Sequence, residues 1–166
     1  ENVPQKMINA ILAIEDRRFF EHPGIDFIGI IRAVVKNFTG QSREGASTIT
    51  MQVARNFFLS SEKTLKRKFN EILLSLKIEN KLTKEEILEL YINQIYLGQR
   101  SFGFSAAANT YFNKSLENLN LAEIALLAGL PKAPSRYNPL SNTDLAIARQ
   151  HTVLNNMYKY GFIDRP

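Results

Sequence analysis

The chain contains no cysteine, and this absence removes two kinds of chemistry. Without cysteine there is neither a disulfide framework nor a thiolate nucleophile. Histidine is nearly as scarce, because His22 and His151 are the only two and lie far apart in the sequence. A zinc site would need both of them together with carboxylates, so a zinc enzyme is a poor explanation of this sequence.

Long apolar runs are also absent. The sequence has no run of about 18 apolar residues, the length that a bilayer-spanning helix requires, and no visible signal peptide. Apolar residues nonetheless make up 45% of the 166 residues, too many for a disordered chain. This content suits one domain, residues 1–166, with a sizeable core. The abrupt start at Glu1 suggests a piece of a longer protein.

The formal net charge of +5 indicates an anionic partner. Nucleic acid, a phospholipid surface and a phosphorylated substrate would each fit this charge. Net charge alone does not choose among them.

The spacing of apolar residues predicts helices almost throughout, with no convincing alternating strand. Cap and stop signals place the expected helices at residues 4–15, 26–38, 47–58, 60–80, 83–98, 120–129 and 144–160. A small-residue segment at 105–109 would allow close contact between helices. Because the connections are short, we expect an all-α globule of one or two lobes.

Two acids stand side by side at the end of the first expected helix. Glu15 falls on its apolar stripe, whereas Asp16 is rotated about 100° away. A carboxylate on a buried stripe is desolvated, which raises its pKa toward the range useful to a general base. Simple exposure at the helix end explains Glu15 equally well. Asp16 fits a structural role, and His22 fits a turn-stabilising hydrogen bond.

A second acid, Glu71, lies on the expected helix 60–80, which is apolar on two sides. Such a helix is usually central to its domain, so we expect Glu71 to be half-buried. An Arg67–Glu71 pair would contribute only ~0.2–0.5 kcal/mol, a weak reason to carry a charge there. Basic residues cluster near it in the sequence, namely Arg55, Lys63, Lys66, Arg67 and Lys68. A solvated face is the commoner meaning of such a cluster, but cations beside a semi-buried acid also suit a departing pyrophosphate.

Five short blocks follow one another along the chain. They are EDxxFxxHxG from Glu15, GASTITMQ from Gly45, RKxxE from Arg67, ILExYxNxxYxG from Ile87, and the segment from Glu123 to Pro131. In this order and spacing they cover nearly the whole chain, which resembles the peptidoglycan glycosyltransferase domain, or transglycosylase domain, of class A penicillin-binding proteins. The chain departs from that family at Met51, where many members have glutamine, and at Asn70, which is often basic.

The resemblance implies a lysozyme-like, mainly helical fold with a second small lobe, the membrane-associating jaw lobe, built from the second and third helices. Phe38, Phe57, Phe58 and Leu59 are then candidates to face lipid. Packing into a core is an equally good explanation for any one of these side chains.

The activity implied by the resemblance is polymerisation of lipid II into β-1,4-linked glycan strands, with inversion and release of undecaprenyl pyrophosphate. Glu15 corresponds to the general base and Glu71 to the second catalytic glutamate. The positions expected to bind substrate and pyrophosphate are Arg32, Ser47, Thr48, Gln52, Arg55, Lys63, Arg67, Lys68 and Asn93. The resemblance implies no required cofactor, with a divalent cation, Mg or Mn, as an optional addition.

The implied partners are lipid II with its growing glycan, an anionic membrane surface and a moenomycin-type inhibitor, but not nucleic acid. The implied location is the periplasmic, extracytoplasmic side of the bacterial plasma membrane. We therefore expect residues 1–166 to be excised from a longer protein with an N-terminal transmembrane helix and a C-terminal transpeptidase domain.

Two other functions compete with this interpretation. A muramidase or lytic transglycosylase would share the helical frame and a catalytic glutamate, but it has little use for pyrophosphate-binding cations. A non-catalytic basic module that binds membrane or nucleic acid would leave the two placed acids unexplained, and the sequence has no recognisable nucleic-acid motif.

Overall fold

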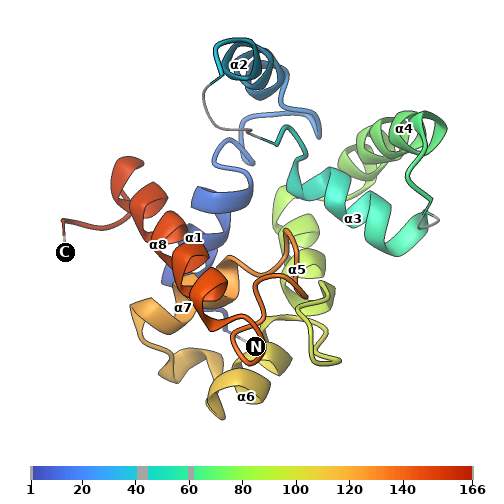
Figure 1. The fold of residues 1–166 in the computed structure, drawn as a ribbon. Coiled ribbons are helices and arrows are strands. Elements are labelled where there is room, and N and C mark those ends of the chain that lie inside the picture. Colours follow the sequence, from blue (N-terminus) through green and yellow to red (C-terminus); the bar gives the residue numbers. More distant parts are fainter. Residues whose placement is uncertain (1, 41–44, 60–61, 166) are drawn as a thin grey trace. The chain divides into compact units, whose positions relative to one another are not determined.

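The computed structural model describes residues 2–40, 45–59 and 62–165, and these residues form helices joined by loops of varied length (Figure 1). The elements are α1 (Gln5–Glu15), α2 (Phe27–Phe38), α3 (Ile49–Phe58), α4 (Leu65–Lys81), α5 (Lys84–Gln94), α6 (Phe104–Phe112), the 3-10 turn η1 (Leu116–Asn118), α7 (Leu121–Ala128) and α8 (Thr143–Lys159). The all-α prediction is confirmed.

Side-chain caps explain why several helices begin where the sequence predicts. Asp26 and Thr48 accept hydrogen bonds from backbone amides in the first turns of α2 and α3. Reciprocal capping boxes, Thr83 with Glu86 and Asn120 with Glu123, precede α5 and α7. Each cap satisfies amides that the helix itself leaves without a partner. The expected start of α4 at residues 60–61 lies outside the described residues, and α4 begins at Leu65.

The prediction that the fifth helix continues to Gly98 is wrong. α5 ends at Gln94, and the chain then makes a tight turn in which Tyr96 and Phe102 form an isolated antiparallel bridge. Gly103 has a φ of 86°, and a Cβ at this position would collide with the carbonyl oxygen of Asn93. The turn therefore requires glycine, and its backbone pairing replaces the last helical turn.

The chain forms two compact units, one made of segments 1–17 and 92–166 and the other of residues 18–91. In the first unit α1 packs against α7 and α8, which also pack against each other. Their shared core includes Ile11, Leu127 and Val153, each fully buried. The side-chain amide of Asn156 donates to the carbonyl oxygen of Ala13 at 3.2 Å, joining the last helix to the first.

In the second unit α3 packs against α4. Thr50 donates to Glu79 at 2.7 Å, and the Lys84 ammonium binds the same carboxylate oxygen at 2.6 Å. That ammonium also lies 4.5 Å from the centroid of the Phe19 ring. These contacts connect α3, the end of α4, the start of α5 and the loop that follows α1.

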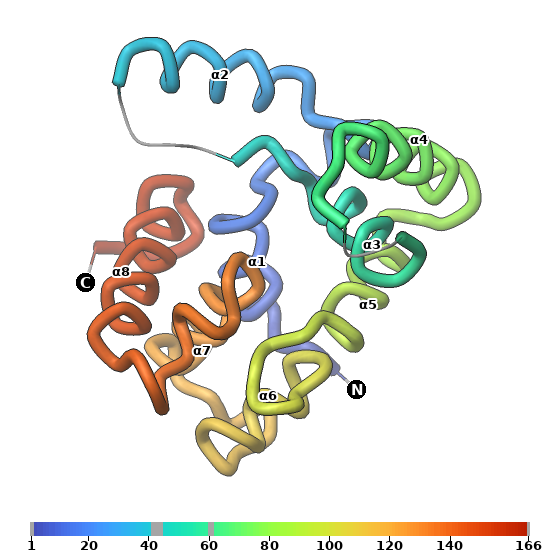
Figure 2. The backbone as a smooth tube through the Cα atoms, turned by 45° about the vertical axis from the view of Figure 1, so that its right-hand side comes forward, coloured from blue at the N-terminus to red at the C-terminus, as the bar shows by residue number. Residues whose placement is uncertain are grey.

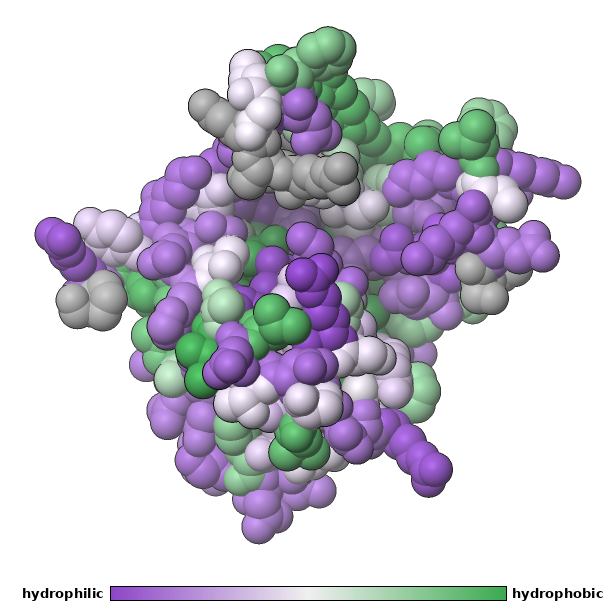
Figure 3. Space-filling model, viewed as in Figure 1, coloured by the Kyte–Doolittle hydropathy of each residue, from purple (hydrophilic) through white to green (hydrophobic). Residues whose placement is uncertain are grey.

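α2 presents most of its apolar side chains to solvent, and Ala33 is its one buried residue. Figure 2 shows this helix lying apart from α3 and α4 of the same unit. Ile31 is 65% exposed and Phe38 is 89% exposed, and the hydrophobic colour gathers over α2 in the space-filling view (Figure 3). Of the other candidate lipid-facing residues, Phe58 is exposed, whereas Phe57 and Leu59 are half-buried. Within the described ranges, no helix is long and apolar enough to cross a membrane.

Candidate active site

Glu15 is the last residue of α1, and its side chain is only 10% exposed. The expectation of a desolvated carboxylate therefore fits better than simple exposure at the helix end. Arg149 on α8 places a guanidinium nitrogen 3.6 Å from Glu15 Oε1. Burial disfavours the ionised carboxylate, whereas a cation at this distance favours it. The carboxylate thus experiences two opposing influences within one unit.

Glu71 lies in the second turn of α4 and is fully buried, rather than half-buried as expected. Its Oε1 accepts a hydrogen bond of 3.1 Å from the Lys68 ammonium, one helical turn earlier. Oε2 is also buried and accepts no hydrogen bond from any described residue. A buried charged oxygen without a donor is costly, so the carboxylate depends on its contact with the Lys68 ammonium for compensation of its charge.

Lys68 connects Glu71 to the segment before α3. Its ammonium also donates to Ser47 Oγ at 3.1 Å, so one cation binds both oxygens. The adjacent Thr48 is buried, caps α3 and donates to the carbonyl oxygen of Gly24 at 2.6 Å. Three predicted site residues, Ser47, Lys68 and Glu71, are thereby joined by direct contacts. The alternative pairing of Glu71 with Arg67 is replaced by the pairing with Lys68.

The other predicted site residues differ in exposure. Gln52 is buried on α3, where its side-chain oxygen accepts a long bond of 3.5 Å from the Tyr91 hydroxyl. Half-buried basic side chains lie on three helices of the second unit, namely Arg32 on α2, Arg55 on α3 and Arg67 on α4. Lys63 and Asn93 are exposed. Arg55 thus lies on α3, Arg67 and Lys68 lie on the packed helix α4, and Lys63 precedes α4, but of these four it is Lys68 that is shown in contact with the buried Glu71 carboxylate.

His22 has the structural role that the sequence suggests. Its Nδ1 accepts a hydrogen bond of 3.0 Å from the backbone amide of Gly24. Because an amide can only donate, the ring nitrogen that faces it carries no proton. Asp16 is buried and follows the last turn of α1, with its own amide bonded to the carbonyl of Leu12.

Sequence reasoning missed Arg149, which contacts Glu15 from the far end of the chain. Its position on a helix predicted only from apolar spacing gave no signal of this pairing. Tyr137, whose ring centroid lies 5.4 Å from the Arg149 guanidinium, was also missed, because it lies in the connection between α7 and α8 where the sequence carried no motif.

The described residues contain no group of three or more acidic or histidine side chains that could together hold a metal ion. Glu71 is a single carboxylate already bound by a cation, which does not fit a metal centre held by protein side chains.

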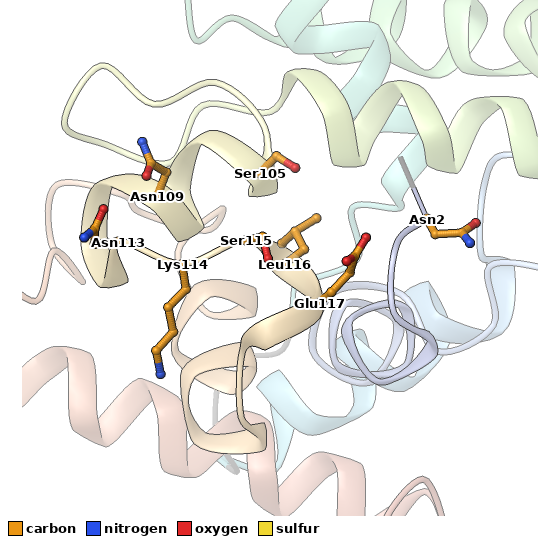
Figure 4. Close-up of a pocket in the computed structure, with 8 residues that line it drawn as sticks. All are labelled: Asn2, Ser105, Asn109, Asn113, Lys114, Ser115, Leu116 and Glu117. Atoms are coloured by element: carbon orange, nitrogen blue, oxygen red, sulfur yellow. The ribbon is translucent and has the colours of Figure 1, made fainter.

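A surface pocket of about 280 Å³ lies in the first unit and is drawn in Figure 4. Its lining is mainly neutral and polar, with asparagine and serine side chains beside Lys114 and Glu117. None of the predicted site residues lines it, so the candidate site is built on other elements.

A protein-family model described as Transglycosylase matches residues 1–158 of the chain. Penicillin-binding protein 1A of Neisseria lactamica is 60% identical over 155 residues, covering 93% of this chain and 19% of that protein. A Cupriavidus necator protein that carries the provisional name of a transglycosylase is 56% identical over 163 residues, covering 98% of this chain and 71% of that protein.

Among solved structures, penicillin-binding protein 1A from Haemophilus influenzae matches with a TM-score of 0.49 and 39% identity. That match covers 70% of this chain and 14% of the other. The chain thus spans about a fifth of the length of the Neisseria protein that it matches.

Proposed function

This chain belongs to the transglycosylase family, and from that membership we propose that it is a peptidoglycan glycosyltransferase of cell-wall synthesis. Its substrate is lipid II, its product is a β-1,4-linked glycan strand, and undecaprenyl pyrophosphate leaves. The five sequence blocks and the relatives named as transglycosylase or penicillin-binding protein support this proposal.

In this function Glu15 is the general base. Its carboxylate accepts the proton of the 4-hydroxyl on the acceptor N-acetylglucosamine. That oxygen then bonds to the anomeric carbon of the lipid-linked N-acetylmuramic acid, and the bond to the phosphate oxygen breaks with inversion. A side chain that is 10% exposed is shielded from bulk water, and the guanidinium 3.6 Å away favours the ionised form that a base requires. A placed base contributes roughly 10²–10⁴ in rate, so substrate positioning and leaving-group stabilisation supply the remainder.

The observation that carries the proposal is the buried Glu71 carboxylate on α4 bound by the Lys68 ammonium, with further basic residues on α4 and on the packed helix α3. Arg55, Lys63, Arg67 and Lys68 offer several positive charges to a diphosphate, while Glu71 fixes the Lys68 ammonium by a bond of 3.1 Å. A cation and a phosphate oxygen 4 Å apart attract by ~4 kcal/mol at an effective dielectric of 20. An enzyme that cleaves glycan releases no diphosphate and has no need of these basic residues.

The exposed apolar face of α2 supports association with a membrane, where the lipid tail of the substrate resides. A basic chain with this face suits an anionic bilayer surface. We place the domain on the extracytoplasmic face of the bacterial plasma membrane, where lipid II is polymerised.

The test is incubation of the purified chain with labelled lipid II in detergent or vesicles, followed by separation of glycan strands. Polymer should form and should disappear when moenomycin, the phosphoglycolipid inhibitor of the family, is added. Parallel incubation with purified sacculi distinguishes this function from that of a glycan-cleaving enzyme, the main alternative. Soluble muropeptides from sacculi without polymer from lipid II would instead establish a glycan-cleaving enzyme.

A further inference from the structure

Three contacts determine where the Arg149 guanidinium lies. Its Nη2 is 3.6 Å from Glu15 Oε1, and its Nε donates to the carbonyl oxygen of Gly129 at 3.2 Å. The ring centroid of Tyr137 lies 5.4 Å from the guanidinium carbon. The Arg149 side chain is 11% exposed, so it is held mainly by protein. All four residues belong to the first unit.

Gly129 provides the space that Arg149 occupies. A Cβ at this position would lie 2.7 Å from Arg149 Cγ, closer than carbon atoms approach in folded proteins. The φ of Gly129 is −78°, which any residue adopts. Glycine is therefore needed here for the close approach of the arginine stem and not for backbone freedom.

Tyr137 provides the other support. An aromatic face attracts a cation whose centre lies within about 6 Å of the ring centroid, and the guanidinium stacks on such rings. The backbone amide of Tyr137 donates to the carbonyl of Ala133 at 3.0 Å, which fixes its turn after α7. The ring is thus attached to a hydrogen-bonded turn on one side of Arg149, and the Gly129 carbonyl is a second attachment.

We propose that Tyr137 and Gly129 are positioning residues that hold Arg149 against Glu15, and that Arg149 keeps this carboxylate ionised and fixed in direction. The inference rests on the proposed function, because it takes Glu15 to be the general base. Both positioning residues act through Arg149 and touch no reacting atom.

The other charged groups on the helices packed against α1 are engaged elsewhere or exposed. Glu123 on α7 binds the Lys114 ammonium at 2.7 Å. Asp144, His151 and Lys159 on α8 are exposed. Arg149 is therefore the charged group of α7 and α8 that faces Glu15, and its displacement should change the ionisation of Glu15 directly.

The first measurement needs no substrate. Glu15 is followed by carbon-13 NMR of the glutamate carboxyl groups, assigned with Glu15→Gln, while the pH is varied. In Arg149→Gln the midpoint of its titration should move to higher pH by roughly 1–3 pH units. In Tyr137→Leu the midpoint of the Glu15 titration should move in the same direction by at least ~0.5 pH unit. Tyr137→Phe keeps the aromatic ring, so Glu15 in this variant should titrate as it does in the parent chain.

The second measurement is polymerisation of lipid II across the same pH range. In Tyr137→Leu, kcat should fall at low pH while KM changes less than twofold, and the acid limb should move with the NMR midpoint. A lost structural support alone would lower activity at all pH values together. If the parent chain forms no polymer but its variants show the expected NMR shifts, the proposed polymerisation reaction is wrong. The proposal that Tyr137 and Gly129 position Arg149 against Glu15 then remains supported.

Gly129→Ala keeps the inference falsifiable if Tyr137→Leu does not fold, which far-ultraviolet circular dichroism will show. The added methyl group should displace the Arg149 stem and move the Glu15 midpoint upward. Folded Tyr137→Leu or Gly129→Ala chains whose Glu15 titrates as in the parent would overturn the proposal. An equal shift in Tyr137→Phe would overturn the role given to the ring.

Discussion

At the scale of single residues, the two glutamates have contrasting surroundings. Glu15 faces a guanidinium at 3.6 Å and keeps 10% of its side chain exposed, whereas Glu71 is fully buried and hydrogen-bonded to an ammonium. A proton acceptor needs access to substrate, while a group that fixes a cation does not. These surroundings suit the different roles that we propose for the two acids.

Changing Glu15 to Gln should abolish polymerisation while leaving lipid II binding intact. The amide keeps the size of the side chain but cannot accept the hydroxyl proton. We expect turnover to fall by roughly 10²–10⁴, measured by strand formation, with the dissociation constant for lipid II changed less than about threefold. Residual turnover above a tenth of the parent value would remove Glu15 from this role.

Changing Arg67 to Ala should weaken engagement of the lipid-linked donor. A charge-assisted hydrogen bond contributes about 1.5–3 kcal/mol, so we expect the apparent KM for lipid II to rise roughly tenfold or more. Lys66→Ala is the matched control, because Lys66 is an exposed cation on the same helix. Equal donor affinity in Arg67→Ala and the parent would argue against a pyrophosphate contact at this position.

Changing Lys68 to Met should destabilise the second unit. The buried Glu71 carboxylate would lose its donor, which costs about 1–3 kcal/mol. Adding Glu71→Gln to the same chain removes the charge and should restore part of that loss. Urea unfolding of both single variants and the double variant measures the coupling. Strictly additive effects would mean that the 3.1 Å contact contributes nothing to stability.

At the scale of elements, sequence reasoning located helices better than it located their neighbours. The capping residues of α2, α3, α5 and α7 were predictable because each cap involves groups a few residues apart. The end of α5 was not, because the turn after it depends on glycines and backbone pairing that compete with the helix. The apolar stripe of α2 was visible in the sequence, but spacing cannot tell whether another element covers a stripe.

In the candidate site, too, the sequence predicted local features better than it predicted contacts between distant residues. Its residue types followed from the family blocks, and the desolvation of Glu15 followed from the helical pattern. The partner of Glu71 is Lys68 instead of Arg67, and the partner of Glu15 comes from α8. Side-chain partners that are distant in sequence, or that compete on one helix face, are decided by packing.

The α7 capping box should make stability depend on pH. The hydrogen bond from the Lys114 side chain, followed by that from the Asn120 backbone, lowers the pKa of Glu123. When folding lowers the pKa of a carboxyl group, its ionisation stabilises the native state at pH values above the ordinary pKa of 4.5. This stabilisation is lost as the pH falls through the lower pKa of the folded state.

Glu123→Gln should therefore lower the melting temperature at pH 7, and the difference from the parent should shrink below pH 4.5. Thermal unfolding from pH 3 to 7 measures it. Glu117→Gln provides a control, since Glu117 is an exposed acid on the neighbouring η1. A difference that stays constant across this range would show that ionisation of Glu123 is not its source.

At the scale of the whole molecule, positive charge and an exposed apolar helix occur together. The formal charge of +5 would draw the chain to an anionic bilayer, and α2 offers side chains that can enter its interface. The two contributions differ in their response to salt, because only the electrostatic one is screened.

Binding to vesicles that contain anionic lipid should therefore weaken, but not vanish, between low and high salt. Phe38→Asp should reduce binding at both salt concentrations, as measured by co-sedimentation. Ile147→Asp, which changes an exposed apolar residue on α8, should have a smaller effect. Equal losses in the two variants would show that α2 has no special part in membrane binding.

The split of the first unit between the two ends of the chain has a consequence for biosynthesis. Residues 18–91 are contiguous and leave the ribosome together, whereas α1 emerges before them and must wait for α7 and α8. The Asn156–Ala13 hydrogen bond and the Arg149–Glu15 ion pair can form only after α8 has been translated. In a nascent chain halted before α8, the whole of residues 18–91 would be present, yet the glutamate at position 15 would lack the arginine that pairs with it.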